Sequence, residues 1–515
     1  MIRKGGESFQ WVDQRGVCRL IRQNVITYSI LICHCYAFTS LCGKYQGKQL
    51  FSNVKVLKQQ KLFQSKKNNL EDVSLERDVS SLECWSSEMG IKMADGVSLS
   101  SGFGENDWGF QTTDTFEGRP GESILSVPRS LIMSSQNTLD DLGGMDVFHP
   151  AFDILAEEGV EEYRSQFLLM VKVLYETAQN DSSIWYPWLQ SLPKDFTTGT
   201  YMDDFERQFL SPISLALTEF EDKKLMAFRK ALCAIRSKIN GLGSFLENES
   251  VVMNSDQNDC IKWAFNVVFS RCWIYSDTQQ GMDADANIVP LGDMFNHREP
   301  ANVVVSDDVE KNTDCVEFQL LNNLDDGTTH HHQQQLFLSY GLNNPHRFLV
   351  IFGFVDESMP EIFSQIVFTN PCPELVELGC EDRSKMVYRT EDGLISNAVW
   401  DCILFALLHS KPDEQKLLYD AHVNGNKEGK TKLHAKYALE VLISLRRHIS
   451  DTRFHFESKL SSSGSVNQMV LAEHPRLETI LRMNKFVSSV LGKVLFRVER
   501  MIESEVALRR KQINN

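Results

Sequence analysis

The spacing of apolar residues changes along this 515-residue chain, and the order of the patterns constrains the fold more than any other feature. Residues 96–133 are rich in glycine and in short runs that are typical of strands joined by turns. Between 149 and 266 apolar residues recur at helical spacing, as they do in 167–178, which predicts amphipathic helices. Residues 288–355 return to short strands, and beyond Pro371 the pattern is helical to the end. We therefore expect an α+β protein in which helices interrupt the strands.

Size and charge exclude several classes of protein. A length of 515 residues favours two or three domains, because a single core usually stops growing well below that length. The formal charge of -16 argues against nucleic-acid binding, since phosphate recognition depends on clustered lysine and arginine. No apolar run approaches the roughly 20 residues that a membrane helix needs. We expect a protein partner, no nucleic acid, no stable membrane insertion of the mature chain, and a monomer.

Neither the cysteines nor a run of histidines predicts a metal site. The 12 cysteines include no CxxC pair and are too sparse for a disulfide scaffold. Cys33 and Cys35 form a CxC, but it lies in an apolar leader segment, where a zinc site is not expected. His330, His331 and His332 are adjacent in a polar stretch, and three adjacent histidines cannot all face one ion from a regular element. No metal is expected.

Residues 1–90 are interpreted as a targeting leader followed by a polar linker. Between Arg15 and Leu70 there is no acidic residue, whereas lysine and arginine recur throughout. Val25–Phe38 is a short apolar run preceded by arginines, which suits a signal sequence better than a membrane span. The Ala37–Phe38 junction resembles the cleavage site of two-part plastid presequences. We expect import into a plastid. The alternatives are a disordered basic extension or a misassigned start codon, and hence a cytoplasmic protein.

Three separated segments carry the residues of interest. They are GENDWGFQTT at 104–113, VPLGDMFNH at 289–297 and LFLSYG at 336–341, the last followed closely by VIFGFV at 350–355. Each alone is a strand and a turn with an ordinary structural explanation. In this order, with helices between the first two, they resemble the SET-domain methyltransferases, and most of all the branch of the plant rubisco large-subunit lysine methyltransferases and the actin-histidine methyltransferases.

The resemblance extends to the helical segments. DSSIWYPWLQSLP at 181–193 and WAFNVVFSRCW at 263–273 are similar to the helical insert and the Ser-Arg helix of that branch. The resemblance implies a SET domain at 91–370, built from small twisted β-sheets with a knot-like C-terminal segment. It carries a helical insert at about 150–265. Residues 371–515 then correspond to an all-α substrate-binding domain.

The resemblance also implies a reaction and a catalytic residue. These enzymes transfer a methyl group from S-adenosyl-L-methionine to a nitrogen on a protein, and Tyr340 occupies the place of their catalytic tyrosine. A tyrosine suits an in-line methyl transfer, because its oxygen can face the polarised methyl while its ring lines an apolar channel. Phe352 and Phe354 are candidate substrate-binding residues that could hold a methylated cation. For Phe354, simple core packing is an equally good interpretation.

The candidate cofactor-binding residues come from all three segments and from the Ser-Arg helix. Asn296 and His297 match the family's cofactor-binding turn, and Asp293 matches a position beside cofactor or substrate. Arg271 is expected to meet the carboxylate of the cofactor, with a structural ion pair to Asp293 as the alternative. The first segment contributes Asn106 and Trp108.

Departures from the family pattern leave alternatives open. A glycine of the first motif is Asp107 here, and the family's YGF turn reads Phe352-Gly353-Phe354. No zinc-binding cysteine cluster follows Tyr340, which favours a non-histone substrate. The prediction is a protein-lysine N-methyltransferase. A protein-histidine N-methyltransferase and a catalytically inactive, protein-binding SET module remain as alternatives.

Overall fold

The structure is a computed structural model that describes residues 79–101, 108–246, 259–275, 285–306, 314–321, 334–341, 344–462 and 468–514. The expected leader, Asn106, Asp107 and the three adjacent histidines lie outside these residues. Residues 76–515 form one compact unit. None of the described helices is long and apolar enough to cross a membrane.

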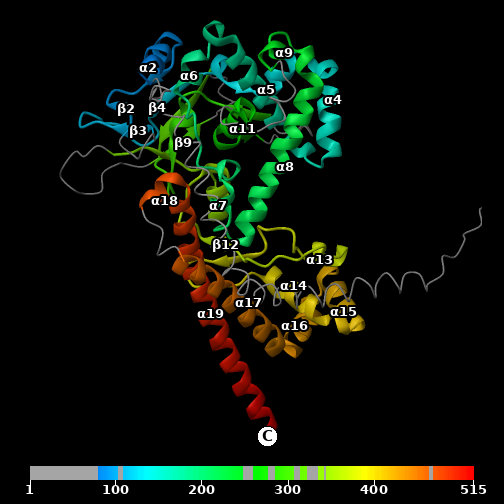
Figure 1. The fold of residues 1–515 in the computed structure, drawn as a ribbon. Helices are drawn as coiled ribbons and strands as arrows, with labels where there is room; N and C mark the ends of the chain where they lie inside the picture. Colours follow the sequence, from blue (N-terminus) through cyan, green and yellow to red (C-terminus); the bar gives the residue numbers. More distant parts are fainter. Residues whose placement is uncertain are drawn as a thin grey trace, which may run out of the picture. The chain divides into compact units, whose positions relative to one another are not determined.

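The segments with strand-like patterns form several small sheets (Figure 1). The largest has the order β1-β4-β10-β9, with all neighbours antiparallel: β1 is Lys92–Met93, β4 Ser123–Pro128, β10 Cys315–Leu320 and β9 Val303–Ser306. In β10 buried and half-buried residues alternate, as expected for a strand with one face on the core. Three smaller sheets are β2-β3 (Val97–Ser100, Gly109–Thr112), β5-β7-β6 (Met133–Ser134, Asp285–Ile288, Trp273–Tyr275) and the parallel pair β8-β11 (Asn296–His297, Phe337–Leu338).

The described residues between β5 and β6 are mainly helical, as expected for the insert. They are α3 Ser135–Asp141, α4 Gly144–Glu157, α5 Arg164–Gln179, α6 Tyr186–Ser191, α7 Asp204–Arg207, α8 Pro212–Ile235, α9 Leu242–Phe245 and α11 Cys260–Arg271. Helix α5 is buried almost all round from Ser165 to Leu174 and is therefore the centre of this block. Preceding the first sheet, α2 (Val79–Glu88) is tied to the block because the indole of Trp85 donates to the carbonyl of Ile184 at 2.7 Å.

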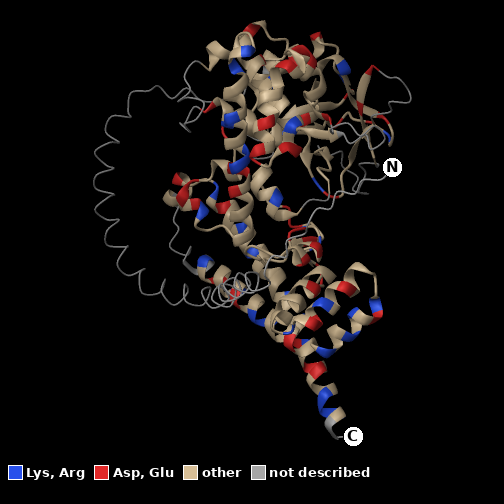
Figure 2. Cartoon of the chain, turned by 90° about the vertical axis from the view of Figure 1, so that its right-hand side faces the viewer, with Lys and Arg blue, Asp and Glu red and all other residues tan. Residues whose placement is uncertain are grey.

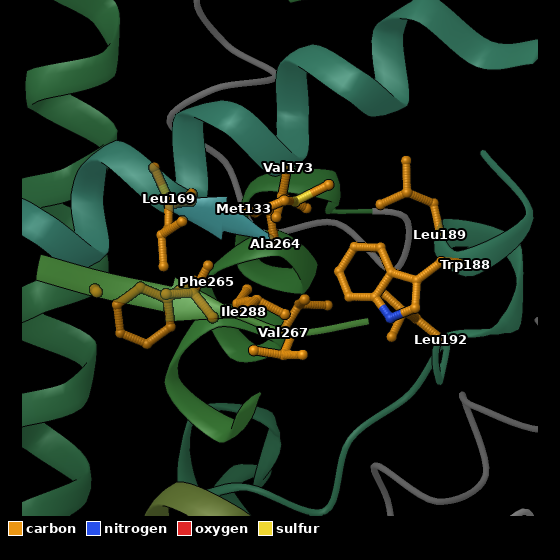
Figure 3. Close-up of a cluster of buried hydrophobic side chains, with 14 of the residues drawn as sticks. Met133, Leu169, Val173, Trp188, Leu189, Leu192, Ala264, Phe265, Val267 and Ile288 are labelled. Carbon is orange, nitrogen blue, oxygen red and sulfur yellow. The ribbon is translucent and has the colours of Figure 1, made fainter. Parts of the chain in front are cut away.

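The sheets and the helical insert share one hydrophobic core. Figure 3 shows side chains from α5, α6, α11 and the strands β5 and β7 gathered in one cluster: Leu169, Val173, Trp188, Ala264, Phe265, Val267, Met133 and Ile288. Burial of this apolar surface stabilises the fold by roughly 25 cal/mol per Å². The core therefore holds α11, which carries Arg271, against the strand that precedes the Asp293 turn.

Beyond the sheets the chain is mainly helical, as expected. The elements are α12 Pro345–Arg347, the π-helical turn η8 Phe348–Phe352, β12 Glu361–Phe363, α13 Pro373–Glu377, β13 Val387–Arg389, α14 Asn397–Leu407, α15 Pro412–Val423, α16 Lys427–Lys436, α17 Ala438–Ser462, α18 Gln468–Glu473 and α19 Leu477–Asn514. α19 spans 38 residues and packs along α17. A second cluster of buried apolar side chains, separate from the first, lies mostly in these helices. Acidic and basic residues are interspersed along the described helices (Figure 2).

Two expectations for this region are wrong. Residues 288–355 were expected to form short strands joined by loops, but 348–352 form the π-helical turn η8. A short apolar run with β-branched and aromatic residues fits a strand and a buried helical turn equally well. The chain beyond Pro371 was expected to be all helical, but β13 pairs with β12 in an antiparallel ladder from Glu361↔Arg389 to Phe363↔Val387.

Candidate active site

The Asn-His turn at 296–297 and the Tyr-Gly turn at 340–341 lie side by side. Strand β8 pairs in parallel with β11, with Asn296 opposite Phe337 and His297 opposite Leu338. Tyr340 follows β11 by two residues, and its ring centroid lies 5.1 Å from that of His297. The sequence separates these two turns by about 40 residues. This separation leaves room for the long connection that two parallel strands need.

The first motif joins the same place through β3. The backbone N–H of Leu336 donates to the carbonyl of Phe110 at 2.8 Å, and that of Thr112 donates to the carbonyl of Gln334 at 2.8 Å. The ring of Phe110 lies 4.5 Å from that of Phe295, in the second motif. All three predicted segments are therefore in contact. Trp108 is half-buried and packs against the core that they share.

Tyr340 is fixed at both its backbone and its hydroxyl. Its backbone N–H donates to Nδ1 of His297 at 3.0 Å, and its hydroxyl donates to the carbonyl of Phe295 at 2.7 Å. The carbonyl belongs to the residue that directly precedes the Asn-His pair. Because two hydrogen bonds at opposite ends of a residue leave few rotamers, the position of the phenol oxygen is set by β8.

Aromatic side chains surround Tyr340 on the side of η8. We call Phe348, Phe352 and Phe354, together with Tyr340 and His297, the aromatic cluster. Tyr340 lies 5.2 Å from Phe352 and 6.5 Å from Phe354, and His297 lies 4.6 Å from Phe348, measured between ring centroids. These spacings are ordinary for interacting aromatic pairs. The cluster gives the site an apolar wall, and both predicted substrate-binding residues belong to it.

Two members of this arrangement were not predicted. Phe348 stacks on His297, and Nε2 of His297 lies 3.0 Å from Oδ2 of Asp356. The His297 side chain is only 2% exposed, so the carboxylate is its partner inside the protein. Asp356 stands in a stretch without periodicity or a motif, and the sequence offers no signal that would single it out.

Arg271 forms an ion pair with Asp293, which was the alternative to cofactor binding in the interpretation of this residue. Nη1 of Arg271 donates to Oδ2 of Asp293 at 2.9 Å and to its carbonyl oxygen at 3.0 Å. The indole N–H of Trp188 lies 3.3 Å from each oxygen of the same carboxylate. The Asp293 side chain is fully buried and that of Arg271 is 13% exposed. Nε of Arg271 is buried and has no hydrogen-bond partner in the described part of the chain.

The turn that carries Asp293 has a strained backbone. Leu291 is fully buried and has φ 66°, a conformation that bulky residues rarely adopt. At Gly292 a Cβ would lie 2.2 Å from the ring of Phe318, so no side chain fits there. The packing around β10 thus fixes the turn before β8.

Proteins of known sequence resemble the chain over part of its length. No family model matches it. The actin-histidine N-methyltransferase of Xenopus tropicalis is 24% identical over 276 residues, which are 53% of this chain and 42% of that protein. The protein SET DOMAIN GROUP 40 of Arabidopsis thaliana is 25% identical over 187 residues, which are 36% of this chain and 33% of that protein. The chain spans about two fifths or less of the length of these relatives.

Solved structures resemble the chain over most of its length. The SET domain of LSMT bound to lysine and AdoHcy matches with a TM-score of 0.54 and 14% identity, over 83% of this chain and 92% of that one. Rubisco LSMT bound to AdoMet matches with a TM-score of 0.54 and 13% identity, over 83% and 93%. The chain therefore has the fold of the SET-domain proteins. Its resemblance to the branch of the rubisco and actin-histidine methyltransferases, predicted from the motifs, is confirmed.

Proposed function

We propose that this protein transfers a methyl group from S-adenosylmethionine to a lysine nitrogen of a non-histone protein. The observation that carries the proposal is the hydroxyl of Tyr340, which donates to the carbonyl of Phe295 at 2.7 Å inside the aromatic cluster. With its proton engaged, the hydroxyl directs its oxygen lone pairs away from that carbonyl. An oxygen held in this way suits a polarised methyl group, and the apolar wall excludes water from the reacting atoms.

The residues near Arg271 fit the proposed cofactor. S-adenosylmethionine supplies a methyl group that is activated by a sulfonium cation. The buried Nε of Arg271, which has no partner in the described residues, suits the carboxylate of such a molecule. Asp293 binds the other side of the guanidinium and keeps it oriented. By resemblance, the remaining contacts come from Asn296 and His297, mostly through backbone groups and the Asn296 amide, and from Trp108 and Asn106.

The aromatic cluster also suits the acceptor. A lysine ammonium must lose its proton before it attacks, and burial beside Phe352 and Phe354 disfavours its charged form. No strong general base is then required. Holding the nitrogen about 3 Å from the methyl carbon contributes several kcal/mol to the rate. After the transfer, aromatic faces stabilise a methylated ammonium by about 0.5 to 2 kcal/mol.

Histidine is the second candidate acceptor. It is favoured by the sequence relatives, several of which are actin-histidine N-methyltransferases. An imidazole is flatter than a lysine side chain and needs less depth, so the two acceptors place different demands on the pocket beside Phe352. The structures that resemble the chain support lysine, since LSMT is described with lysine and with methyllysine. The modified residue itself decides between the two.

The C-terminal helices and the basic leader complete the proposal. Residues 371–515 are proposed to select the protein substrate. Residues 1–70 are proposed to direct import into a plastid, where a stromal protein such as rubisco or aldolase is a suitable target by resemblance. A fluorescent fusion of residues 1–70 tests the second point. Diffuse cytosolic fluorescence would contradict plastid import and leave the cytoplasmic alternative.

Purified protein, labelled S-adenosylmethionine and a cell extract test the reaction. We expect label on a protein, with mass spectrometry locating it on a lysine. Tyr340→Phe keeps the ring but removes the oxygen, and labelling should fall at least about 100-fold because the loss is confined to the transition state. The dissociation constant of the cofactor should change by less than about threefold, since Tyr340 is not proposed to bind it.

The control variant is Tyr175→Phe. Tyr175 lies in α5 of the helical insert, outside the aromatic cluster and outside the proposed substrate-binding helices. This variant should label as well as the wild type. Equal labelling by Tyr340→Phe would remove that residue from its proposed role. A wild-type protein that binds the cofactor and labels nothing would support the protein-binding module instead.

A further inference from the structure

The hydrogen bonds of His297 define which ring nitrogen carries its proton. The backbone N–H of Tyr340 can only donate, so Nδ1 of His297 is the acceptor of that 3.0 Å bond. A neutral imidazole then carries its proton on Nε2. That nitrogen lies 3.0 Å from Oδ2 of Asp356 and donates to it. The bond that holds the backbone of Tyr340 therefore requires the tautomer protonated at Nε2.

Asp356 is itself held so that it can only accept from the ring. Its other oxygen, Oδ1, accepts from the backbone N–H of Ser358 at 2.8 Å and from the Ser358 hydroxyl at 2.7 Å. The carboxylate has no proton to donate, and its second oxygen faces His297. A carboxylate in this place favours the Nε2-protonated ring over the Nδ1-protonated ring, because only the former gives Asp356 a donor.

We propose that Asp356 is a positioning residue for the methyl transfer: it fixes the tautomer of His297, and His297 in turn fixes the backbone of Tyr340. The proposal rests on the proposed function, because it assumes that Tyr340 is the catalytic residue. Asp356 touches neither the methyl group nor the acceptor in this scheme. Its effect reaches the phenol oxygen through Nδ1 of His297 and the Tyr340 amide. The ring of His297 also packs between Tyr340 and Phe348, at 5.1 and 4.6 Å, so a rotated ring would disturb the aromatic cluster.

Replacing Asp356 by asparagine distinguishes this role from simple packing. Asparagine has the same shape, but only one of its two terminal atoms accepts hydrogen bonds. If that oxygen stays with Ser358, the amide nitrogen faces Nε2 of His297 and donates to it. The ring must then be protonated at Nδ1, where it cannot accept from Tyr340. A wrong tautomer in an intact geometry is known to be costly in the aspartate of serine-protease triads.

The first measurement is single-turnover methyl transfer by the full chain with labelled S-adenosylmethionine. We expect the rate to fall about 100-fold in Asp356→Asn, as for a displaced catalytic group, and by no less than in Asp356→Ala. The dissociation constant of the cofactor should stay within about threefold of wild type in both variants. If Asp356 only filled space, asparagine would be much milder than alanine. That ranking would overturn the proposal.

The control uses another aspartate and histidine at the same separation. Nδ1 of His149 lies 3.0 Å from Oδ2 of Asp153, but both side chains are more than 60% exposed. Asp153→Asn should leave the transfer rate unchanged, because the pair lies in α4, outside the candidate site. An equal loss in this variant would show that the effect of Asp356→Asn is not specific to the site.

The second measurement does not depend on activity. Nitrogen NMR shifts of the imidazole ring in labelled protein report the tautomer, and the signal of His297 is assigned by its absence in His297→Gln. We expect protonation at Nε2 in the wild type and at Nδ1 in Asp356→Asn. A wild-type ring protonated at Nδ1, or an unchanged tautomer in the variant, would overturn the role of Asp356. If the wild type transfers no methyl group, the proposed function fails, and the NMR result alone decides how Asp356 and His297 are coupled.

Discussion

Gly353 ends the turn η8 and lies between two phenylalanines of the aromatic cluster. Its φ is 81°, and its backbone N–H donates to the carbonyl of Phe348 at 2.9 Å, which closes the turn. A Cβ at this position would lie 2.0 Å from Oγ1 and 2.8 Å from the carbonyl carbon of Thr197. The chain thus needs a residue without a side chain between Phe352 and Phe354, for two independent reasons.

Gly353→Ala should therefore destabilise the protein by about 2 to 5 kcal/mol. About 1 to 2 kcal/mol comes from the left-handed backbone, and about 1 to 3 kcal/mol from the contact with Thr197. Urea unfolding at neutral pH measures the change. Gly425→Ala is the control, since Gly425 has φ 65° but a methyl group there would meet no atom within 4 Å. Equal losses in the two variants would contradict the contribution of Thr197.

Residues of the candidate site could be predicted where they belong to a recognisable motif. Residues that join the site only through tertiary contacts could not. The contact of Tyr340 with the Asn-His turn followed from a resemblance, because spacing alone does not place together residues that are about 40 positions apart. The partner of Arg271 was left open, since a guanidinium suits a buried carboxylate and a ligand equally well. Asp356 was missed because its contact with His297 joins residues 59 positions apart and no pattern marks it.

At the level of elements, sequence patterns identified long helices better than short pieces. The 38-residue α19 lies in the stretch beyond Pro371 that was predicted to be helical, because its apolar face repeats over many turns. η8 and β13 were missed. Each spans at most five residues, which is too short to show a period, and β13 depends on its pairing with β12. Tertiary contacts decide the structure of such segments.

Helix α16 is an element held by charge rather than by burial. None of its ten residues is buried, and a helix this short that contains Gly429 and Thr431 is marginal by itself. Its anchor is Asp401 of α14, which is 3% exposed and accepts from Lys430 and from Nε2 of His434. We infer that the ion pair of Lys430 with Asp401 of α14 keeps α16 folded.

Lys430→Met should therefore loosen α16. Losing a hydrogen bond to a charged group costs about 1.5 to 3 kcal/mol, so amide exchange in residues 427–436 should become at least about tenfold faster. Lys432→Met is the control in the same helix, because the ion pair of Lys432 is with the exposed Glu428 and such pairs contribute little. Exchange of α14 should not change in either variant. Unchanged protection of α16 in Lys430→Met would contradict the anchor.

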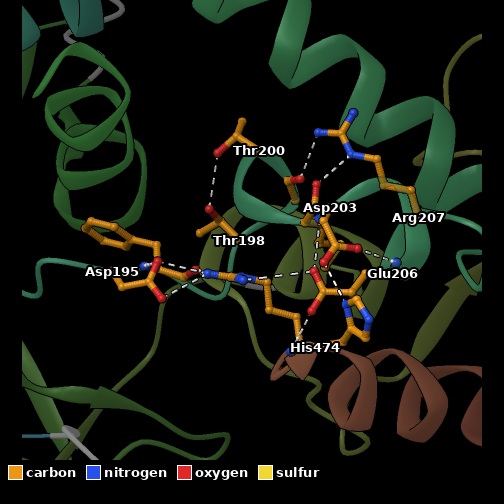
Figure 4. Close-up of polar contacts among 11 residues, drawn as sticks. Asp195, Thr198, Thr200, Asp203, Glu206, Arg207 and His474 are labelled. Carbon is orange, nitrogen blue, oxygen red and sulfur yellow. Dashed lines mark hydrogen bonds and ion pairs between the residues drawn. The ribbon is translucent and has the colours of Figure 1, made fainter. Parts of the chain in front are cut away.

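At the scale of the whole molecule, polar contacts join the C-terminal helices to the helical insert. Figure 4 shows the junction around His474, whose Nδ1 lies 2.7 Å from Oδ2 of Asp203. Nη2 of Arg476 donates to both oxygens of Asp195. Glu206 is fully buried and accepts from the backbone N–H of Arg476 at 2.9 Å. Carboxylates from one part of the chain and a histidine and an arginine from the other thus fix the junction.

A second junction depends on a neutral histidine. His346 is fully buried, lies 2.8 Å from the hydroxyl of Ser214 in α8, and accepts at Nε2 from the side-chain amide of Gln365 at 2.8 Å. Burial lowers the pKa of His346 from 6.5 to about 3, and the charge of Arg383 adds to this effect. A second proton on the ring would remove the acceptor that Gln365 needs.

The pH dependence of stability follows from this lowered pKa. Between pH 6.5 and 3 the unfolded chain binds a proton at His346 that the folded protein does not, so acid stabilises the unfolded state. Stability should fall by up to about 1.4 kcal/mol per pH unit from this residue alone. His346→Asn is less stable at pH 7 because it loses hydrogen bonds, but its stability should fall less steeply between pH 6 and 4. Urea unfolding across that range compares the slopes.

A second histidine does not disturb this comparison. Burial lowers the pKa of His448 to about 4, but His448 titrates in both proteins, so its effect on the two slopes is the same. Parallel slopes would show that His346 is not neutral in the folded protein, and the hydrogen bond from Gln365 would then have to be reassigned.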